Sequence, residues 1–189
     1  TQIVMYLERN SDESSSNLTE HFSSMTNIST DASNLERLNR WSCALRMFEE
    51  RPVFGYGPGT YMFQYAKYQL KKDRTIISTN AGDGGNAHSE YLGPLSESGI
   101  LGLVTFMLLI ITVLYTGIHT WTRLNDSRLK GIVLAAIIGL VTYYVHGFLN
   151  NFLDTDKLSV PFWGFSAMIV AIDLYSRRNE ESNAQKNPA

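Results

Sequence analysis

The sequence predicts an all-α integral membrane protein, with an extracytoplasmic helical loop region followed by three transmembrane helices. The first observation behind this fold class is a split in composition. Residues 8–90 are rich in Ser, Asn, Thr, Gly and charged side chains, whereas long uncharged apolar stretches dominate from Leu92 onward. The second is the length of those stretches, because a helix needs about 20 apolar residues to cross the hydrocarbon core of a bilayer.

Three apolar stretches are candidate spans. Residues 99–119 contain no Asp, Glu, Lys or Arg, and residues 131–153 contain only His146 as an ionisable group apart from tyrosines. Residues 158–172 are shorter and reach spanning length only if Asp173 lies at the interface. We therefore expect transmembrane helices at about 98–120, 131–151 and 158–175, within a membrane region of residues 95–176.

Basic residues around the spans predict their orientation, because Lys and Arg are enriched in short cytoplasmic loops. The segment between the first two spans and the segment after the third each carry three of them: Arg123, Arg128 and Lys130, then Arg177, Arg178 and Lys186. Residues 177–189 are then a cytoplasmic tail, and residues 8–94 lie outside. Residues 1–7 are apolar but too short to span, and we interpret them as the end of a preceding membrane helix.

The outer region predicts two helices, near 34–50 and 61–70. Ser33 and Glu36 fit a capping box before a run with helical spacing. That run consists of Leu35, Leu38, Trp41, Leu45 and Phe48. Pro52 ends the first helix, and the glycine-rich residues 55–59 are expected to form a turn rather than a nucleotide-binding loop, because no strand precedes them.

Composition excludes some classes of function. The formal net charge of −2 gives no support for nucleic-acid binding, and a single cysteine, Cys43, excludes an internal disulfide. The acidic residues Asp154 and Asp156 are too few for a metal site and are more typical of a solvated loop.

Several residues are candidates for chemistry. Arg37 and Arg40 offer planar, permanently charged groups for an anion, although snorkelling arginines on an interfacial helix would look the same. His88 follows a glycine-rich approach close to the first span, and its imidazole is available in neutral form near physiological pH. His146 lies inside the second span, where ionisable groups are functional candidates, or it donates a hydrogen bond to a neighbouring helix.

Four segments in a fixed order resemble the O-antigen ligase family of bacterial membrane proteins. They are Arg37-Leu38-Asn39-Arg40-Trp41, residues 52–59 (PVFGYGPG), residues 87–92 (AHSEYL) and residues 97–102 (ESGILG). The family also includes O-antigen polymerases and protein O-oligosaccharyltransferases. Its Arg motif matches Arg37, with Trp41 where Leu is often found. Its His motif matches His88 and Gly99, with Ser89 where Asn is common.

The resemblance implies a reaction. The donor is a glycan on undecaprenyl pyrophosphate at the outer leaflet, and the acceptor is lipid A-core or another glycan or protein. Arg37, Arg40 and a further arginine, Arg74 by location with Arg51 as its rival, would bind the pyrophosphate. His88 would act as general base, with His146, Glu90 and Tyr91 as secondary candidates.

The resemblance also implies that neither a metal nor a cofactor is required, because the lipid pyrophosphate is already activated. It places the protein in the bacterial inner membrane with its active site facing the periplasm. Two alternatives stay open from the sequence. In the first, the chain is a polysaccharide polymerase or a protein glycosylation enzyme. In the second, it is a transporter or a structural membrane subunit. Transporters tend to place ionisable groups near the bilayer midplane.

Overall fold

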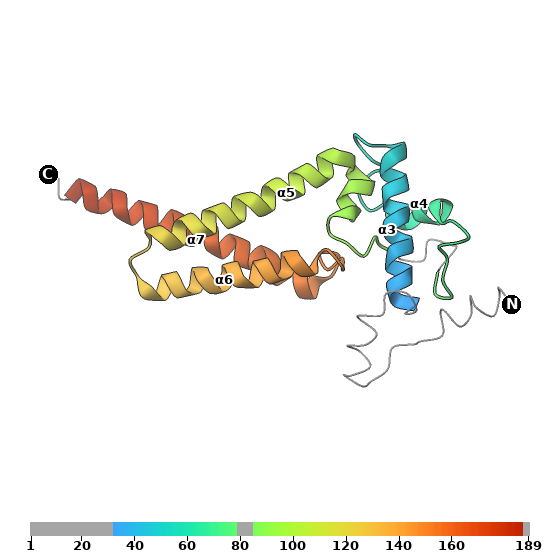
Figure 1. Ribbon diagram of the computed structural model, residues 1–189. Helices are drawn as coiled ribbons and strands as arrows, with labels where there is room; N and C mark the ends of the chain where they lie inside the picture. Colours follow the sequence, from blue (N-terminus) through green and yellow to red (C-terminus); the bar gives the residue numbers. More distant parts are fainter. Residues whose placement is uncertain (1–31, 79–84, 187–189) are drawn as a thin grey trace, which may run out of the picture. The chain divides into compact units, whose positions relative to one another are not determined.

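The computed structural model describes residues 32–78 and 85–186, and the regular structure within them is entirely helical (Figure 1). This confirms the predicted all-α class. The described helices are α3 (Ala32–Glu50), α4 (Tyr61–Tyr68), α5 (Leu92–Arg123), α6 (Ser127–His146) and α7 (Asp156–Lys186). The predicted end of a preceding helix at residues 1–7 lies outside the described residues, as do residues 187–189 of the predicted tail.

The chain divides into two compact units. The first contains α3, α4 and the first turns of α5, as far as Leu103, and in it α3 packs against α4. The second begins at Val104 and contains the rest of α5 together with α6 and α7, which pack against each other.

The predicted capping box at the start of α3 is wrong. The helix spans Ala32–Glu50, so Ser33 lies within it rather than before it. The Glu36 carboxylate accepts hydrogen bonds from Arg40 Nε at 2.9 Å and from Thr75 Oγ1 at 2.9 Å. The Glu36 side chain therefore connects α3 to a distant segment instead of capping its own helix.

The buried face of α3 is polar at its N-terminal half. Glu36, Asn39 and Arg40 are buried, while Leu38 and Leu45 of the apolar run are 42% and 45% exposed. Asn39 Nδ2 donates to Gln69 Oε1 at 3.2 Å and to Ser78 Oγ at 3.3 Å. Ser78 also donates to Glu36. The segment after α4 is therefore attached to α3 by a buried polar network, which is stable only because its members are hydrogen-bonded.

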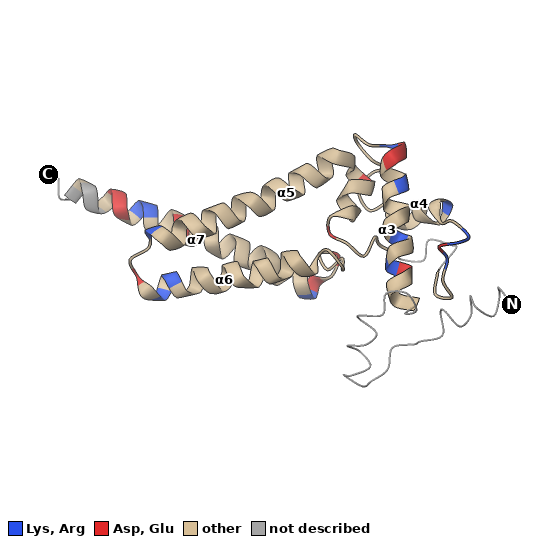
Figure 2. Cartoon of the chain, viewed as in Figure 1, with Lys and Arg blue, Asp and Glu red and all other residues tan. Residues whose placement is uncertain are grey.

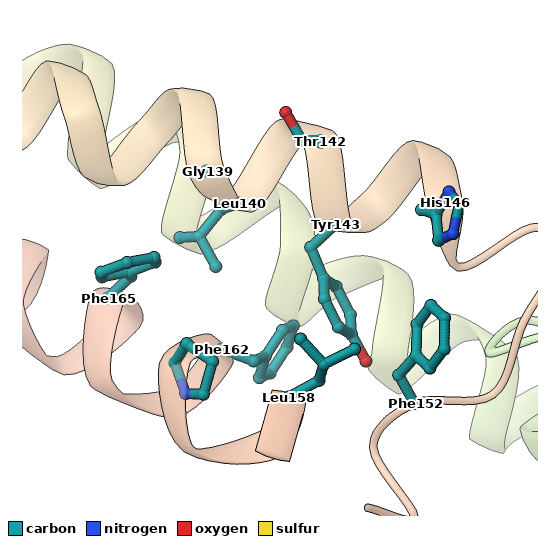
Figure 3. A pocket seen from close by; sticks show the side chains of 10 residues that line it. Gly139, Leu140, Thr142, Tyr143, His146, Phe152, Leu158, Phe162 and Phe165 are labelled. Atoms are coloured by element: carbon teal, nitrogen blue, oxygen red, sulfur yellow. The ribbon is translucent and has the colours of Figure 1, made fainter.

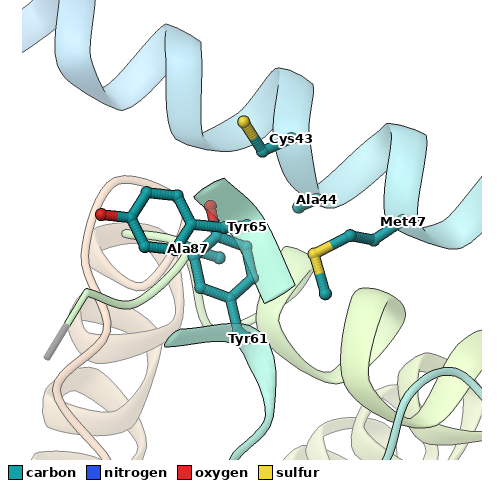
Figure 4. Close-up of a cluster of buried hydrophobic side chains, with 6 residues drawn as sticks. All are labelled: Cys43, Ala44, Met47, Tyr61, Tyr65 and Ala87. Atoms are coloured by element: carbon teal, nitrogen blue, oxygen red, sulfur yellow. The ribbon is translucent and has the colours of Figure 1, made fainter. Parts of the chain in front are cut away.

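A small apolar core continues the same face toward the C-terminal end of α3 (Figure 4). Its buried members are Cys43, Ala44, Met47, Tyr61, Tyr65 and Ala87. The Tyr61 and Tyr65 rings of α4 stack with centroids 5.4 Å apart, and the Tyr61 hydroxyl donates to the Arg40 carbonyl at 2.8 Å. Ala87 anchors the segment before α5 in this core.

The glycine-rich turn at 55–59 docks onto the segment at 97–99 by backbone contact. Gly57 N donates to the Glu97 carbonyl at 2.7 Å, and Ile100 N donates to the Pro52 carbonyl at 2.7 Å. A Cβ on Gly55 would overlap the Glu97 backbone, and a Cβ on Gly99 would overlap the Val53 carbonyl. Glycine is therefore needed at both Gly55 and Gly99, because side chains at these positions would hold the two backbones apart.

The Glu97 side chain completes this contact at the N-terminus of α4. Its carboxylate accepts from Gly59 N at 2.8 Å and from Tyr61 N at 2.9 Å. A carboxylate at this position satisfies N–H groups that have no partner within the helix and interacts favourably with the helix dipole.

Three of the described helices, α5, α6 and α7, are long and apolar enough to cross a membrane. Figure 2 shows long stretches of each without charged residues. Gly99 interrupts α5 with φ 66° and ψ −159°. The helix that follows this kink, residues 100–123, is about 36 Å long at 1.5 Å per residue, and it exceeds the roughly 30 Å of bilayer hydrocarbon.

A charged cluster joins α5 to α7 at the Arg123 end of the second unit. Asp173 accepts from Thr120 Oγ1 at 2.9 Å and from Arg123 Nη2 at 3.0 Å, and it pairs with Arg177 Nε at 2.9 Å. Asp173 is buried, so these partners offset the cost of removing its charge from water. Between the two acidic loop residues, the Thr155 carbonyl accepts from Ser159 N at 3.0 Å at the start of α7.

We predict that Gly99→Ala destabilises the first unit. The backbone conformation at Gly99 is essentially restricted to glycine, so strain alone costs about 1–3 kcal/mol, and the added methyl group also overlaps Val53. Urea-dependent proteolysis of the complete protein measures this loss. Gly131→Ala, with open space around its Cβ position on α6, is the control, and equal resistance of the two variants would contradict the prediction.

We also predict that Glu36→Ala is strongly destabilising, because it leaves the Arg40 guanidinium buried without its counter-charge. Breaking one partner of a buried pair costs about 3–5 kcal/mol. Glu49→Ala on the exposed side of the same helix should change stability by no more than about 0.5 kcal/mol. Similar unfolding midpoints for Glu36→Ala and Glu49→Ala would show that the buried pair is dispensable.

Candidate functional site

The predicted site residues outside the membrane spans all lie in the first unit. Arg37 and Arg40 come from α3, Arg74 from the segment after α4, and His88 from the segment before α5. Residues separated by about 50 positions in the sequence are therefore positioned by the same small helical pair. His146 belongs to the second unit.

The His88 backbone adopts a left-handed conformation with φ 48°, the one non-glycine residue in the described chain with positive φ. Two hydrogen bonds hold it there. His88 N donates to Asn86 Oδ1 at 3.1 Å, and Trp41 Nε1 donates to the His88 carbonyl at 3.3 Å. A backbone conformation that needs support from its surroundings is a common feature of functional sites.

Arg40 holds the segment that leads to His88. Its Nε pairs with Glu36 Oε1 at 2.9 Å, and its Nη1 donates to the Asn86 carbonyl at 3.1 Å. The guanidinium also lies 5.1 Å from the Tyr65 ring centroid in a cation–π arrangement. With 8% of the residue exposed, Arg40 is a buried connector between α3 and the His88 segment.

The electrostatics of the site favour a neutral imidazole. Burial and, after it, the positive charges of Arg40 and Arg37 lower the pKa of His88 from 6.5 to about 4, while Glu36 opposes the shift. The two arginines therefore lie near enough to influence His88. A neutral imidazole at physiological pH retains a nitrogen lone pair that can accept a proton.

Arg37 is positioned differently from Arg40. Its Nη1 donates to Asn34 Oδ1 at 2.9 Å, one turn earlier on α3, and the side chain is only half-buried. A guanidinium has five N–H donors, so this contact, the one hydrogen bond of the Arg37 side chain within residues 32–78 and 85–186, leaves it with capacity to bind an anion through two donors.

Arg74 has a buried Nε atom without a hydrogen-bond partner within the described residues. Its neighbour Thr75 bonds to Glu36, so the backbone of this segment lies against the N-terminal half of α3. The rival residue Arg51 follows the other end of α3, where it stacks 4.4 Å from the Tyr56 ring centroid. Arg51 follows Arg37 by 14 residues. At a rise of about 1.5 Å per helical residue, this spacing places the two arginines toward opposite ends of α3.

The residues after His88 lead into α5, which begins at Leu92. Ser89 is buried, and its Oγ accepts from Tyr91 N at 3.3 Å and from Leu92 N at 3.4 Å. Glu90 is also buried. Burial, followed by the charge of Glu90, raises the pKa of Tyr91, so its phenol stays protonated near neutral pH.

His146 ends α6 beside a pocket of about 360 Å³ between α6 and α7 (Figure 3). Its ring stacks on Phe152 with centroids 5.4 Å apart and planes 7° apart. The remaining lining is mostly apolar and includes Tyr143, Phe162 and Phe165. This pocket matches aromatic or hydrocarbon groups rather than an anion.

Sequence patterns did not identify the residues that support His88. Asn86 forms an Asx-type turn with His88 N. An Asn two residues before another residue can indicate such a turn, so this support had a local signal in the sequence. Trp41 was singled out only as an apolar and motif residue. Its indole N–H bond to a carbonyl 47 positions away in sequence has no local signal.

The arrangement combines two guanidinium groups with a neutral imidazole on one polar helical unit. Arginine binds phosphate-type anions through paired N–H donors, and a neutral imidazole accepts a proton from a hydroxyl group. These are the components of a site for group transfer from a phosphorylated donor to an alcohol.

Comparisons with known proteins agree with the resemblance found in the sequence. Residues 2–107, more than half of the chain, match the family described as O-antigen ligase. A Haemophilus influenzae protein described as uncharacterized is 26% identical over 174 residues, which cover 91% of this chain and 37% of that protein. The chain thus spans little more than a third of that relative, and no solved structure matches it. The match over residues 2–107, with the helical spans that follow, shows that this chain belongs to the O-antigen ligase family.

Proposed function

We propose that the chain carries the catalytic region of a membrane glycosyltransferase that moves a glycan from undecaprenyl pyrophosphate to an acceptor hydroxyl. The single observation that carries this proposal is the placement of Arg37, Arg40 and His88 on one unit, with both cations acting on the imidazole. Membership of the O-antigen ligase family supports the same class of reaction. The activity belongs to the complete protein, since this chain spans 37% of its relative.

In the proposed mechanism, Arg37 and Arg74 bind the donor pyrophosphate. Their N–H donors stabilise the negative charge that grows on the leaving phosphate as the bond to the sugar breaks. His88 accepts the proton of the acceptor hydroxyl while that oxygen forms the new bond to the sugar carbon. The displaced lipid pyrophosphate is already a good leaving group, so the chain's own residues have to position two substrates and accept one proton.

The proposed location is the bacterial inner membrane, with the site facing the periplasm. The basic residues Arg128 and Lys130 at the start of α6, and Arg177 and Arg178 in the last third of α7, support a cytoplasmic position for those helix ends. Lipid A-core is the proposed acceptor. Another glycan chain or a protein would use the same donor chemistry.

We predict that His88→Ala reduces glycan transfer by about 10²–10⁴-fold, the usual contribution of a general base, while the protein still inserts. Gel analysis of lipopolysaccharide from a deletion strain complemented at equal protein abundance measures the transfer. His119→Ala, an exposed histidine of α5, is the matched control and should retain activity. Transfer by His88→Ala at the wild-type level would remove the proposed base.

The same deletion strain distinguishes the possible acceptors. Loss of capped lipid A-core with intact lipid-linked polymer indicates a ligase, whereas single repeat units on lipid A-core indicate a polymerase. Unchanged lipopolysaccharide together with loss of glycoprotein indicates transfer to protein.

Arg37→Lys should impair transfer in each case, because an ammonium group does not reproduce the paired donors of guanidinium. Normal transfer by Arg37→Lys would remove Arg37 from donor binding.

We further predict the pH dependence of transfer. A general base acts in its deprotonated form, and the pKa of His88 is lowered from 6.5 to about 4. Activity should therefore persist below pH 6.5 and decline only as pH falls toward about 4. Initial rates of the purified complete protein with a lipid-linked glycan, measured from pH 4 to 8, check this. A decline centred at pH 6 or above would contradict the neutral, cation-flanked imidazole.

A further inference from the structure

Arg40 differs from the other candidate phosphate-binding arginines in burial and in its partners. Arg37 is half-buried and bonds to one neutral side chain. Arg40 is buried, its Nε is paired with a buried carboxylate, and its Nη1 donates to a main-chain carbonyl. A pyrophosphate that recruited Arg40 would compete with Glu36 for the same cation. These contacts therefore favour an indirect role.

The indirect role follows from the position of the carbonyl that Arg40 binds. Asn86 accepts from Arg40 through its main-chain oxygen and accepts from His88 N through its side chain. One residue thus connects the guanidinium to the left-handed turn at His88. Trp41, adjacent to Arg40 on α3, binds the carbonyl of His88 itself. Two consecutive residues of the helix consequently fix both ends of this turn.

Gly85 completes the contact. A Cβ at Gly85 would overlap Nη1 of Arg40, so the chain passes directly against the guanidinium at this point. The side chain of Arg40 has little freedom to move aside, because Glu36 holds its Nε and Tyr65 lies beneath its plane. Any larger residue at position 85 has to displace the guanidinium from the Asn86 carbonyl.

We propose that Arg40 is a positioning residue for the transfer reaction, which fixes the Gly85–His88 turn through the Asn86 carbonyl and so presents the His88 imidazole to the acceptor hydroxyl. This inference rests on the proposed function and deepens it. Arg37 and Arg40, three residues apart on one helix, then have separate tasks. The first binds the donor, and the second determines where the base stands.

The test compares three variants of the complete protein in steady-state transfer from a lipid-linked glycan: Arg40→Gln, Gly85→Ala and Arg37→Lys. A misplaced base lowers kcat without weakening donor binding, by about 100-fold for a displacement of 1 Å. We expect Arg40→Gln and Gly85→Ala to share this pattern, with donor KM within about twofold of wild type, the scale of a change that leaves binding intact. Arg37→Lys should instead raise donor KM.

The pH profile supplies a readout that a purely structural role would not change. Arg40→Gln removes a cation near His88, so the acidic limb of activity should move to higher pH, whereas Gly85→Ala retains the charge and should move it less. Because Arg40→Gln also leaves Glu36 without its cationic partner, kcat is expressed per folded molecule. If Arg40→Gln does not fold, the kinetics of Gly85→Ala test the positioning role, since both Glu36 and Arg40 remain in that variant. Lys71→Ala, an exposed residue in the same unit, is the control with unchanged kinetics.

Two results would overturn the positioning role. The first is a raised donor KM for Arg40→Gln together with wild-type kinetics for Gly85→Ala, which would place Arg40 on the phosphate. The second is wild-type kcat in both variants. Failure of the proposed function looks different, because in that case the wild-type protein itself transfers no glycan from the lipid-linked donor, or His88→Ala transfers it normally.

Discussion

The buried ion pair between Glu36 and Arg40 is the contact on which the first unit depends. Each charge would be costly to remove from water alone, and the pair is stable because hydrogen bonds satisfy its remaining groups. Thr75 bonds to the carboxylate, and the Asn86 carbonyl accepts from the guanidinium. The pair therefore holds two segments that follow α4 against one helix. Those segments carry Arg74 and His88.

A second constraint is the backbone contact between the glycine turn at 55–59 and residues 97–99. Both partners lack side chains at the closest points, and both glycines there adopt positive φ. This contact fixes the start of α4 through Glu97 and places a kink in α5 at Gly99. The unit that carries the candidate site thus contains the bend in α5.

Charge is used in opposite ways in the two units. In the first, the positive charges of Arg40 and Arg37 add to the effect of burial and lower the pKa of His88, which favours its neutral form. In the second, Arg123 and Arg177 are engaged by Asp173, which lets α5 and α7 associate through a polar contact. The pocket between α6 and α7 near His146 is lined mainly by aromatic and aliphatic groups. The candidate anion-binding residues Arg37 and Arg74 are both in the first unit.

The sequence by itself determined the all-α class and the three apolar helices, because an uninterrupted apolar run of spanning length has few other stable structures. It also determined the family, through the order of four short motifs. Tertiary structure decided which face of α3 is buried. The apolar run of Leu38 and Leu45 is exposed, while Glu36, Asn39 and Arg40 are inside. Helical periodicity alone favours the opposite orientation, because it registers hydrophobicity and not the partners that polar groups find in distant segments. The support of His88 by Trp41 and Asn86 likewise required the fold, since hydrogen bonds to main-chain carbonyls far along the chain leave no pattern in the residues that accept them.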